Sequence, residues 1–174
     1  TQEFDASPEL IQYTLSIFMI VMALGQLFIG PISDQYGRKR VLLLSCFNFF
    51  LGSIICALTK NIYFFLFGRS MQALGACGGY AVSIACVRDS FSGRESQKAF
   101  SYFVGINGIA PIIAPILGTI IAHLSGSWRF CFHYLALTGI LSFYLINNYL
   151  YETKLDQTKA SNWPTMKDVG EVFF

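Results

Sequence analysis

Charged residues are scarce in this chain. Asp, Glu, Lys and Arg make up 13% of its 174 residues, whereas a soluble globular domain carries about 25%. Apolar residues account for 54% of the chain, and the mean hydropathy is +0.52. These values exclude an ordinary water-soluble domain. The small net charge of +2 gives no reason to expect a nucleic-acid partner.

Clusters that could hold a metal or carry out catalysis are also missing. Metal ligation and redox chemistry need cysteines at short paired spacings, and no nucleophile stands with a base in the pattern of a membrane-embedded enzyme. We therefore expect no enzyme activity, no metal and no cofactor. We interpret the cysteines as buried free thiols, and they are Cys46, Cys56, Cys77, Cys86 and Cys131.

Alternation with a period of two, the sign of a transmembrane barrel, is absent, and long apolar runs take its place. Each run has roughly the 20 residues that a helix needs to cross a hydrocarbon core of about 30 Å. Because a helix satisfies its own backbone hydrogen bonds, we predict an all-α integral membrane helical bundle. The predicted spans are residues 10–29, 41–59, 62–87, 99–124 and 130–150.

Acidic residues are absent from these spans, and the single base inside them is Arg69. Burying an arginine in a membrane costs on the order of 2.5–3.5 kcal/mol. We therefore expect Arg69 to meet water, substrate, a carbonyl or a carboxylate from another segment. Gln72, Ala76, Tyr80 and Ser83 follow at helical spacing, which predicts a polar stripe along a central pathway. The alternative is that Arg69 snorkels toward the headgroups.

Small residues and prolines mark two further places. Gly75 and Gly79 form a GxxxG step, which permits close contact between helices. In the fourth span, Pro111 and Pro115 lie on one face, where each removes a backbone hydrogen bond. We predict a helix that bends and approaches a neighbour closely, against the alternative that prolines are simply common in membrane helices. The small residues beside the prolines are Ala110, Ala114 and Gly118.

Lys and Arg are distributed unevenly. Nine of the 12 lie after the first, third or fifth span, and the other connections hold only Lys60 and Arg129. The positive-inside rule then places the basic connections and residues 152–174 in the cytoplasm, and residues 1–9 in the periplasm. The chain would then start on the periplasmic side, and its first residues lack a positively charged leader. We therefore expect one more span to precede it. We expect residues 1–151 to belong to a six-helix unit, and residues 152–174 to link it to a second half.

Several segments together resemble a known family. The stretch Gly30–Arg40 looks like motif A of the major facilitator superfamily, in the form GxxxDxxGRKR, and Phe67–Gly75 is similar to its motif B. Ala110–Gly118 looks like the antiporter motif C, although many members have glycine where Ala110 and Ala114 stand here. The sequence resembles drug:proton antiporters of the twelve-helix type, most closely the bicyclomycin and chloramphenicol resistance branch (Bcr/CflA). That branch is also suggested by Arg88–Glu95, Trp128–Arg129 and Glu152–Thr153.

The resemblance implies that the spans are helices two to six of the amino-terminal half of a transporter in a bacterial inner membrane. It implies proton-coupled efflux of small amphipathic compounds or drugs by alternating access. The partners would be the lipid bilayer, protons, the small-molecule substrate and the carboxy-terminal half. A proton-titrating carboxylate is expected on the first helix. The residues of the cavity and coupling site would be Arg69, Gln72, Gly75, Tyr80 and Asn107.

Two other functions stay open at this point. One is a transporter of the same fold for a specific metabolite, such as a siderophore, an amino acid or a sugar derivative. The other is a structural membrane subunit that transports nothing. Transport assays on variants would distinguish the structural subunit from a transporter. If the chain is purely structural, substitution of Arg69 or of the Gly30–Arg40 segment leaves transport by the assembly unchanged.

Motif A also implies a conformational switch at the cytoplasmic face. We expect Pro31 to end the first span, and Asp34 to cap the second helix and complement its dipole. We expect Arg38 to reach Asp89. In the alternative interpretation Asp34 only caps a helix and the bases only set topology. The predicted switch residues are Gly30, Asp34, Gly37, Arg38, Lys39 and Asp89.

Overall fold

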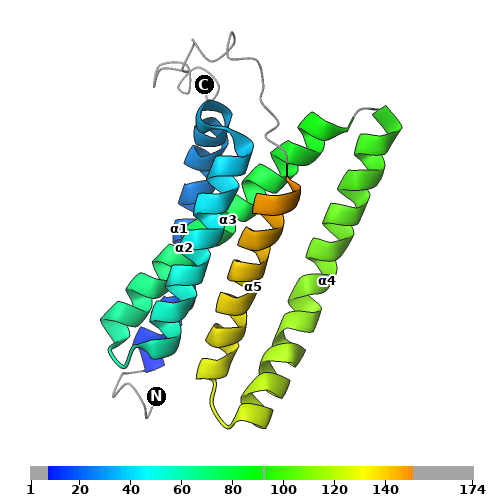
Figure 1. Ribbon diagram of the computed structural model, residues 1–174. Helices are drawn as coiled ribbons and strands as arrows, with labels where there is room; N and C mark the ends of the chain where they lie inside the picture. The colour runs from blue at the N-terminus through cyan, green and yellow to red at the C-terminus, as the bar shows by residue number, and fades with distance from the viewer. Residues whose placement is uncertain (1–7, 92, 151–174) are drawn as a thin grey trace.

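A computed structural model describes residues 8–91 and 93–150, so the predicted linker at residues 152–174 and most of the predicted periplasmic start lie outside it. The described residues form five α-helices and no strand (Figure 1). All five helices are long and apolar enough to cross a membrane. The predicted all-α membrane helical bundle is therefore confirmed. The helices are α1 (Pro8–Tyr36), α2 (Arg38–Leu58), α3 (Ile62–Ser90), α4 (Gly93–Ser125) and α5 (Arg129–Tyr149).

The end of α1 differs from the prediction. Pro31 lies inside the helix and does not end it. A proline removes one backbone donor, but the hydrogen bonds after it are intact, since Gly37 N donates to Ser33 O at 3.2 Å. The helix ends at Tyr36, before Gly37, whose φ of 94° lies in a region that other residues rarely adopt. α4 likewise begins six residues before the predicted span, at Gly93.

Four of the helices form a packed body, which consists of α1, α2, α3 and α5. α2 packs against both α3 and α5, and α1 packs against α3. α4 stands to one side and touches only α3 and α5, at few places (Figure 1). None of the described residues of α4 is buried. The apolar core therefore lies between the helices of the packed body.

Glycines bring α2 and α3 into backbone contact. A Cβ atom added to Gly52 of α2 would lie 2.5 Å from Gln72 N, and one added to Gly75 of α3 would lie 2.5 Å from Phe49 N. Gly79 has no atom within 4 Å of such a Cβ. The predicted close contact is thus confirmed at Gly75, where α3 meets α2. Gly79 faces away from α2, and a close contact there stays a prediction.

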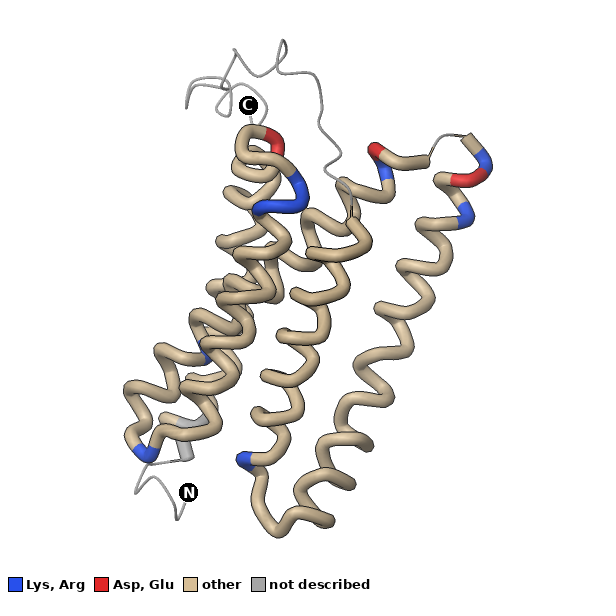
Figure 2. The backbone as a smooth tube through the Cα atoms, viewed as in Figure 1, with Lys and Arg blue, Asp and Glu red and all other residues tan. Residues whose placement is uncertain are grey.

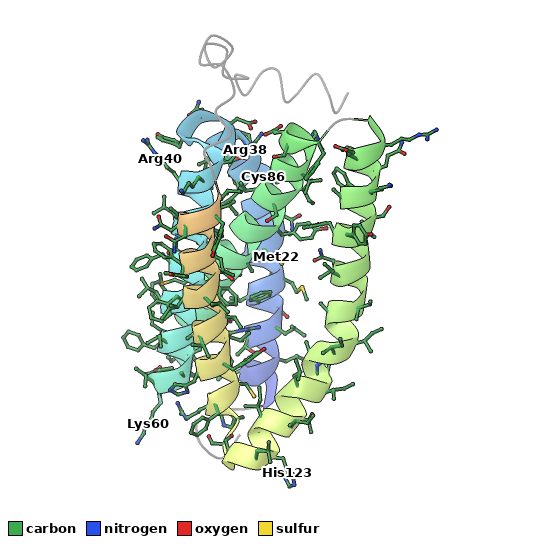
Figure 3. The ribbon with its side chains drawn as sticks, turned by 45° about the vertical axis from the view of Figure 1, so that its right-hand side comes forward. Met22, Arg38, Arg40, Lys60, Cys86 and His123 are labelled. Atoms are coloured by element: carbon green, nitrogen blue, oxygen red, sulfur yellow. The ribbon has the colours of Figure 1, made fainter. Side chains whose placement is uncertain are left out.

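Charges gather at the two ends of the bundle and are rare between them (Figure 2). One end, called here the basic end, carries the residues around the α1–α2 and α3–α4 connections. Figure 3 shows Arg38, Arg40 and Cys86 toward this end, and Lys60 and His123 at the other end, called here the distal end. This arrangement leaves an apolar belt around the middle of the helices, as a membrane-spanning bundle requires.

Candidate functional site

Arg38 is the centre of a polar cluster at the basic end. Its Nη2 lies 2.6 Å from Asp34 Oδ1, its Nε lies 3.0 Å from Asp89 Oδ2, and its Nη1 donates to Ser33 Oγ at 2.6 Å. We call these four residues the Arg38 cluster. The Arg38 side chain is 9% exposed, against 16% for Asp89 and 56% for Asp34. The cluster therefore joins a nearly buried cation to one sheltered and one exposed carboxylate.

Three helices supply the cluster. Ser33 and Asp34 lie in the last turn of α1, Arg38 is the first residue of α2, and Asp89 lies in the last turn of α3. Gly37 turns the chain between α1 and α2, so that Arg38 folds back onto the end of α1. The contact between Arg38 and Asp89 was predicted from the sequence, and the structure confirms it. Its role in switching stays a prediction.

Ser33 is a member of the cluster that the sequence analysis missed. It is 1% exposed, and its hydroxyl donates to Gly30 O at 2.8 Å. That bond leaves the oxygen lone pairs to accept from Arg38. The sequence carried one signal, because Ser33 directly precedes Asp34 in the segment that was predicted to form the switch.

The predicted capping role of Asp34 is wrong. Asp34 belongs to α1, and Gly37 occupies the N-cap position of α2 with no side-chain cap hydrogen bond. The reason is the passage of α1 through Pro31, which moves the helix boundary beyond Asp34. Its carboxylate pairs with Arg38 four residues later, across the connection.

Lys39 binds a helix end rather than an acid. Its Nζ donates at 2.9 Å to the carbonyl oxygen of Asn147, in the last turn of α5. At the distal end, Arg129 of α5 donates to Ala57 O at 2.9 Å and to Thr59 O at 2.7 Å, at the end of α2. The final carbonyls of a helix lack intrahelical partners and favour cations. α2 and α5 are therefore joined reciprocally, each by a base near its own N-terminus.

Arg69 is half-buried in the packed body. Its Nη1 donates to Gln72 Oε1 at 2.6 Å, and its guanidinium carbon lies 4.4 Å from the ring centroid of Phe18 and 6.0 Å from that of Phe132. The guanidinium thus stands among α1, α3 and α5. Among residues 8–91 and 93–150, no Asp or Glu forms an ion pair with it. Its observed partners are the carbonyl oxygen of the Gln72 amide, which belongs to one of the expected classes of partner, and two aromatic faces.

The predicted polar stripe on α3 is divided between two faces. Gln72 is 1% exposed and its Nε2 donates to Ser53 Oγ of α2 at 2.9 Å, while Gly75 packs on the α2 backbone. Tyr80 is 39% exposed, and its ring centroid lies 5.5 Å from that of Phe103 in α4. Gln72 and Gly75 therefore lie at the α2–α3 interface, and the lining of a pathway by the predicted cavity residues stays a prediction.

The prolines of the predicted motif on α4 do not contact another described helix. Pro111 and Pro115 lie inside the helix and are exposed, as are Ala110 and Ala114. Gly118 has no atom within 4 Å of an added Cβ, although its carbonyl accepts from Cys131 Sγ at 3.4 Å. The Asn107 side chain donates to Phe103 O of its own helix. The proposed close approach of this face stays a prediction.

The cysteines are free thiols throughout the described residues. Cys56 and Cys77 are buried, and the other three are half-buried. In the same part of the chain, no group of three or more His, Cys, Asp or Glu side chains could hold a metal ion. The polar groups that remain are those around Arg38, Arg69 and the ends of α2 and α5.

Comparison with known proteins agrees with this arrangement. The sequence model described as Major Facilitator Superfamily matches residues 1–168. The uncharacterized MFS-type transporter YdgK of Bacillus subtilis (strain 168) is 39% identical over 153 residues, which cover 87% of this chain and 38% of YdgK. Multidrug resistance protein MdtL of Escherichia coli O139:H28 is 34% identical over 162 residues, 93% of this chain and 41% of MdtL. MdtL of Shigella flexneri matches equally well. The chain thus spans about two fifths of the length of these relatives.

Proposed function

The chain belongs to the major facilitator superfamily of transporters, and from this premise we propose that it takes part in proton-coupled efflux of small amphipathic compounds. The substrate class is suggested by the similarity to MdtL, whose name is that of a multidrug resistance protein. The direction of transport is suggested by the paired prolines Pro111 and Pro115, which look like the motif of exporters. Alternating access moves such a substrate by rocking two halves of the protein about a central site.

The observation that carries this proposal most directly is the Arg38 cluster. It ties the last turns of α1 and α3 to the first residue of α2 through ion pairs at 2.6 and 3.0 Å. A charge network of this kind has two discrete states, paired and separated, and its members cannot be separated without exposing a nearly buried guanidinium. It is therefore suited to hold one conformation of the transporter and release it in the other.

Arg69 supplies the second support, because coupling to protons needs a charged group within the membrane. Its guanidinium has Gln72 as its hydrogen-bond partner and Phe18 beneath it. We assign the proton-titrating acid to a segment outside the described residues, within reach of Arg69. Proton binding to that acid would weaken its attraction to the guanidinium and couple the proton to substrate release.

The finer placement of the chain follows from the same reasoning. We propose that the five helices are helices two to six of an amino-terminal half in the Bcr/CflA branch, with residues 152–174 as the linker to a carboxy-terminal half. The basic end would face the cytoplasm of a bacterial cell, since nine of the 12 bases fall in that end or in the linker. The membrane would be the inner membrane.

Transport by the intact protein in everted membrane vesicles tests the function. In a strain lacking other drug pumps, vesicles should accumulate a lipophilic cationic dye when energised. They should lose it when the proton gradient is collapsed. Arg38→Ala should slow uptake strongly, because it leaves Asp89 unpaired. Arg40→Ala, which changes an exposed base of the same connection, is the matched control and should transport normally.

One result would decide against drug efflux, and another would decide against the switch. Exchange of protons for one anionic or zwitterionic solute, with no effect on dyes, would favour the metabolite transporter, to which a half-buried Arg69 is equally suited. Normal transport by both Arg38→Ala and Arg40→Ala would remove the switch role of the Arg38 cluster.

A further inference from the structure

A chain of side-chain hydrogen bonds runs from Arg69 through α3 into α2. Arg69 Nη1 donates to Gln72 Oε1 at 2.6 Å, Gln72 Nε2 donates to Ser53 Oγ at 2.9 Å, and Ser53 Oγ donates to Phe49 O at 2.7 Å. Gln72 is 1% exposed and Ser53 is 0% exposed. The path is therefore shielded from solvent at the contact between the two helices.

The two ends of this series of hydrogen bonds determine which group donates and which accepts at each step. A guanidinium can only donate hydrogen bonds, and a backbone carbonyl can only accept them. Ser53 must use its single proton on Phe49 O, so its oxygen accepts from Gln72. The amide nitrogen of Gln72 then faces Ser53, and the amide oxygen faces Arg69. One orientation of the Gln72 amide satisfies every group, and the flipped orientation would place NH₂ against the guanidinium.

We propose that Ser53 is a positioning residue that acts on Arg69 through the amide of Gln72. By accepting from Nε2 it holds the amide oxygen toward Arg69. This keeps the guanidinium beside the Phe18 ring at 4.4 Å. Within the described residues Gln72 uses one of the five N–H donors of Arg69, and a carboxylate approaching from elsewhere would bind the others. The positioning of Arg69 by Ser53 stands on the geometry, and its effect on proton coupling rests on the proposed function.

The close approach of the helices makes Ser53 hard to replace. The preceding residue, Gly52, sits so near α3 that an added Cβ would lie 2.5 Å from Gln72 N. A water molecule in place of a lost hydroxyl needs room and at least two polar partners, and this interface offers little space. Removal of the hydroxyl therefore leaves Gln72 Nε2 buried without its acceptor, and the amide is free to rotate.

The groups around Arg69 limit what else could change with pH. α1 and α5 present the rings of Phe18 and Phe132 to it. From α2, the Cys56 thiol is the titratable group that interacts electrostatically with it. No Asp or Glu of the described residues forms an ion pair with Arg69. A changed pH profile in a Ser53 variant would thus report on Arg69, on Cys56 and on the acid that we propose to pair with Arg69 outside the described residues.

α2 offers a matched control for Ser53. Ser45 is 4% exposed, lies on the same side of α2 against Gly75 and Gly78, and donates to Val41 O at 2.7 Å. Its hydroxyl makes the same bond to the helix backbone but has no amide to hold. Ser45→Ala therefore removes the same atoms from the same interface and leaves Gln72 untouched.

The first experiment measures the pH dependence of dye transport by the intact protein. Ser53→Ala should shift the midpoint of the profile by about half a pH unit, a few-fold in an equilibrium constant, while Ser45→Ala keeps the wild-type midpoint. Equal midpoints for Ser53→Ala and Ser45→Ala would overturn the proposal.

A second experiment does not depend on transport. Thermal unfolding in detergent is compared for Ser53→Ala, Gln72→Leu and the double variant. If the two residues act together, the double variant loses less than the sum of the single losses. Additive losses of stability would overturn the positioning role of Ser53, whichever substrate the protein transports. Absence of proton-coupled transport with non-additive losses would overturn the proposed function and leave the positioning role standing.

Discussion

The α2–α3 interface and helix α4 use glycine in opposite ways. In the interface, glycine allows two backbones to touch, and a Cβ added to Gly52 or Gly75 would lie 2.5 Å from a backbone nitrogen of the other helix. In α4, Gly105, Gly108 and Gly118 have no atom within 4 Å of an added Cβ. Glycine spacing therefore indicates that a helix can be approached closely, and it does not indicate which helix approaches.

The side-chain hydrogen bonds of the two regions also differ, because those of the packed body include bonds between helices and those of α4 mostly lie within the helix. Side chains of the packed body bond between helices, as Gln72 does with Ser53 and Arg129 does with Ala57. On α4, Asn107 and Thr119 bond to carbonyls four residues earlier in their own helix. A helix with internal hydrogen bonds and no buried residue can change neighbours at low cost. We expect the packed body to unfold as one unit, and substitutions in α4 to affect that unfolding little.

The strongest way to break the packed body is to widen the α2–α3 contact. Gly75→Val should destabilise the protein by on the order of 3 kcal/mol or more, because the new side chain meets the α2 backbone and cannot be accommodated by a rotamer change. Gly79→Val is the matched control, four residues along the same helix in open space. Thermal unfolding in detergent and the amount of protein in the membrane measure both. Similar losses for the two variants would show that α2 and α3 are not in backbone contact.

The next largest effect is expected at the Arg38 cluster. Arg38→Ala and Asp89→Asn should each lower stability, and the double variant should fall short of the sum by about 1–3 kcal/mol, since the two groups share one ion pair. Asp34→Asn should cost less, because its carboxylate is 56% exposed and Asp89 is 16% exposed. A double-mutant cycle on unfolding checks the coupling. Additivity would mean that Arg38 and Asp89 are neighbours without mutual stabilisation.

The number of helices and the Arg38–Asp89 contact could both be predicted from the sequence. Apolar runs have to reach a minimum length to cross a membrane, and five runs do so with charged connections between them. Arg38 and Asp89 follow two spans that end on the same side, and the resemblance to motif A indicated Arg38 as the base that reaches an acid there. The extension of α1 through Pro31 could not be predicted, because a proline inside a helix and one at its end have the same local sequence.

The burial of Gln72 and the part played by Ser53 were also beyond prediction. Helical spacing shows that Gln72 shares a face with Arg69, but it does not show which neighbouring helix that face meets. The deciding feature is the approach of α2 at Gly52, which is a property of two segments together. Serine in a membrane helix most simply bonds to its own backbone, and Ser53 does so while also accepting from Gln72.

A smaller effect is expected where α5 holds the end of α2. Arg129→Met should cost about 1–2 kcal/mol, because the half-buried guanidinium bonds the carbonyls of Ala57 and Thr59 and complements the helix dipole. Lys60→Met, at an exposed base in the neighbouring connection, is the control and should change little. Unfolding midpoints at low and high salt check this, with the Arg129 effect retained at high salt. Equal changes for the two variants would contradict a specific bond between α5 and α2.

The smallest expected effect sharpens the comparison between the two regions. Glycine inside a helix costs roughly 0.5–1 kcal/mol relative to alanine, because it loses more conformational freedom on folding. Gly105→Ala should therefore leave the stability unchanged or raise it by up to that amount, since its new methyl group meets no atom within 4 Å. Gly52→Ala adds the same methyl group 2.5 Å from Gln72 N, so it should destabilise the protein in spite of the same gain. Unfolding of the two variants in one detergent gives the sign of each change. A loss of stability in Gly105→Ala would mean that a segment outside the described residues packs closely against α4 at this position. α4 and the α2–α3 interface would then both be closely packed, and they would differ only in the segment that each contacts.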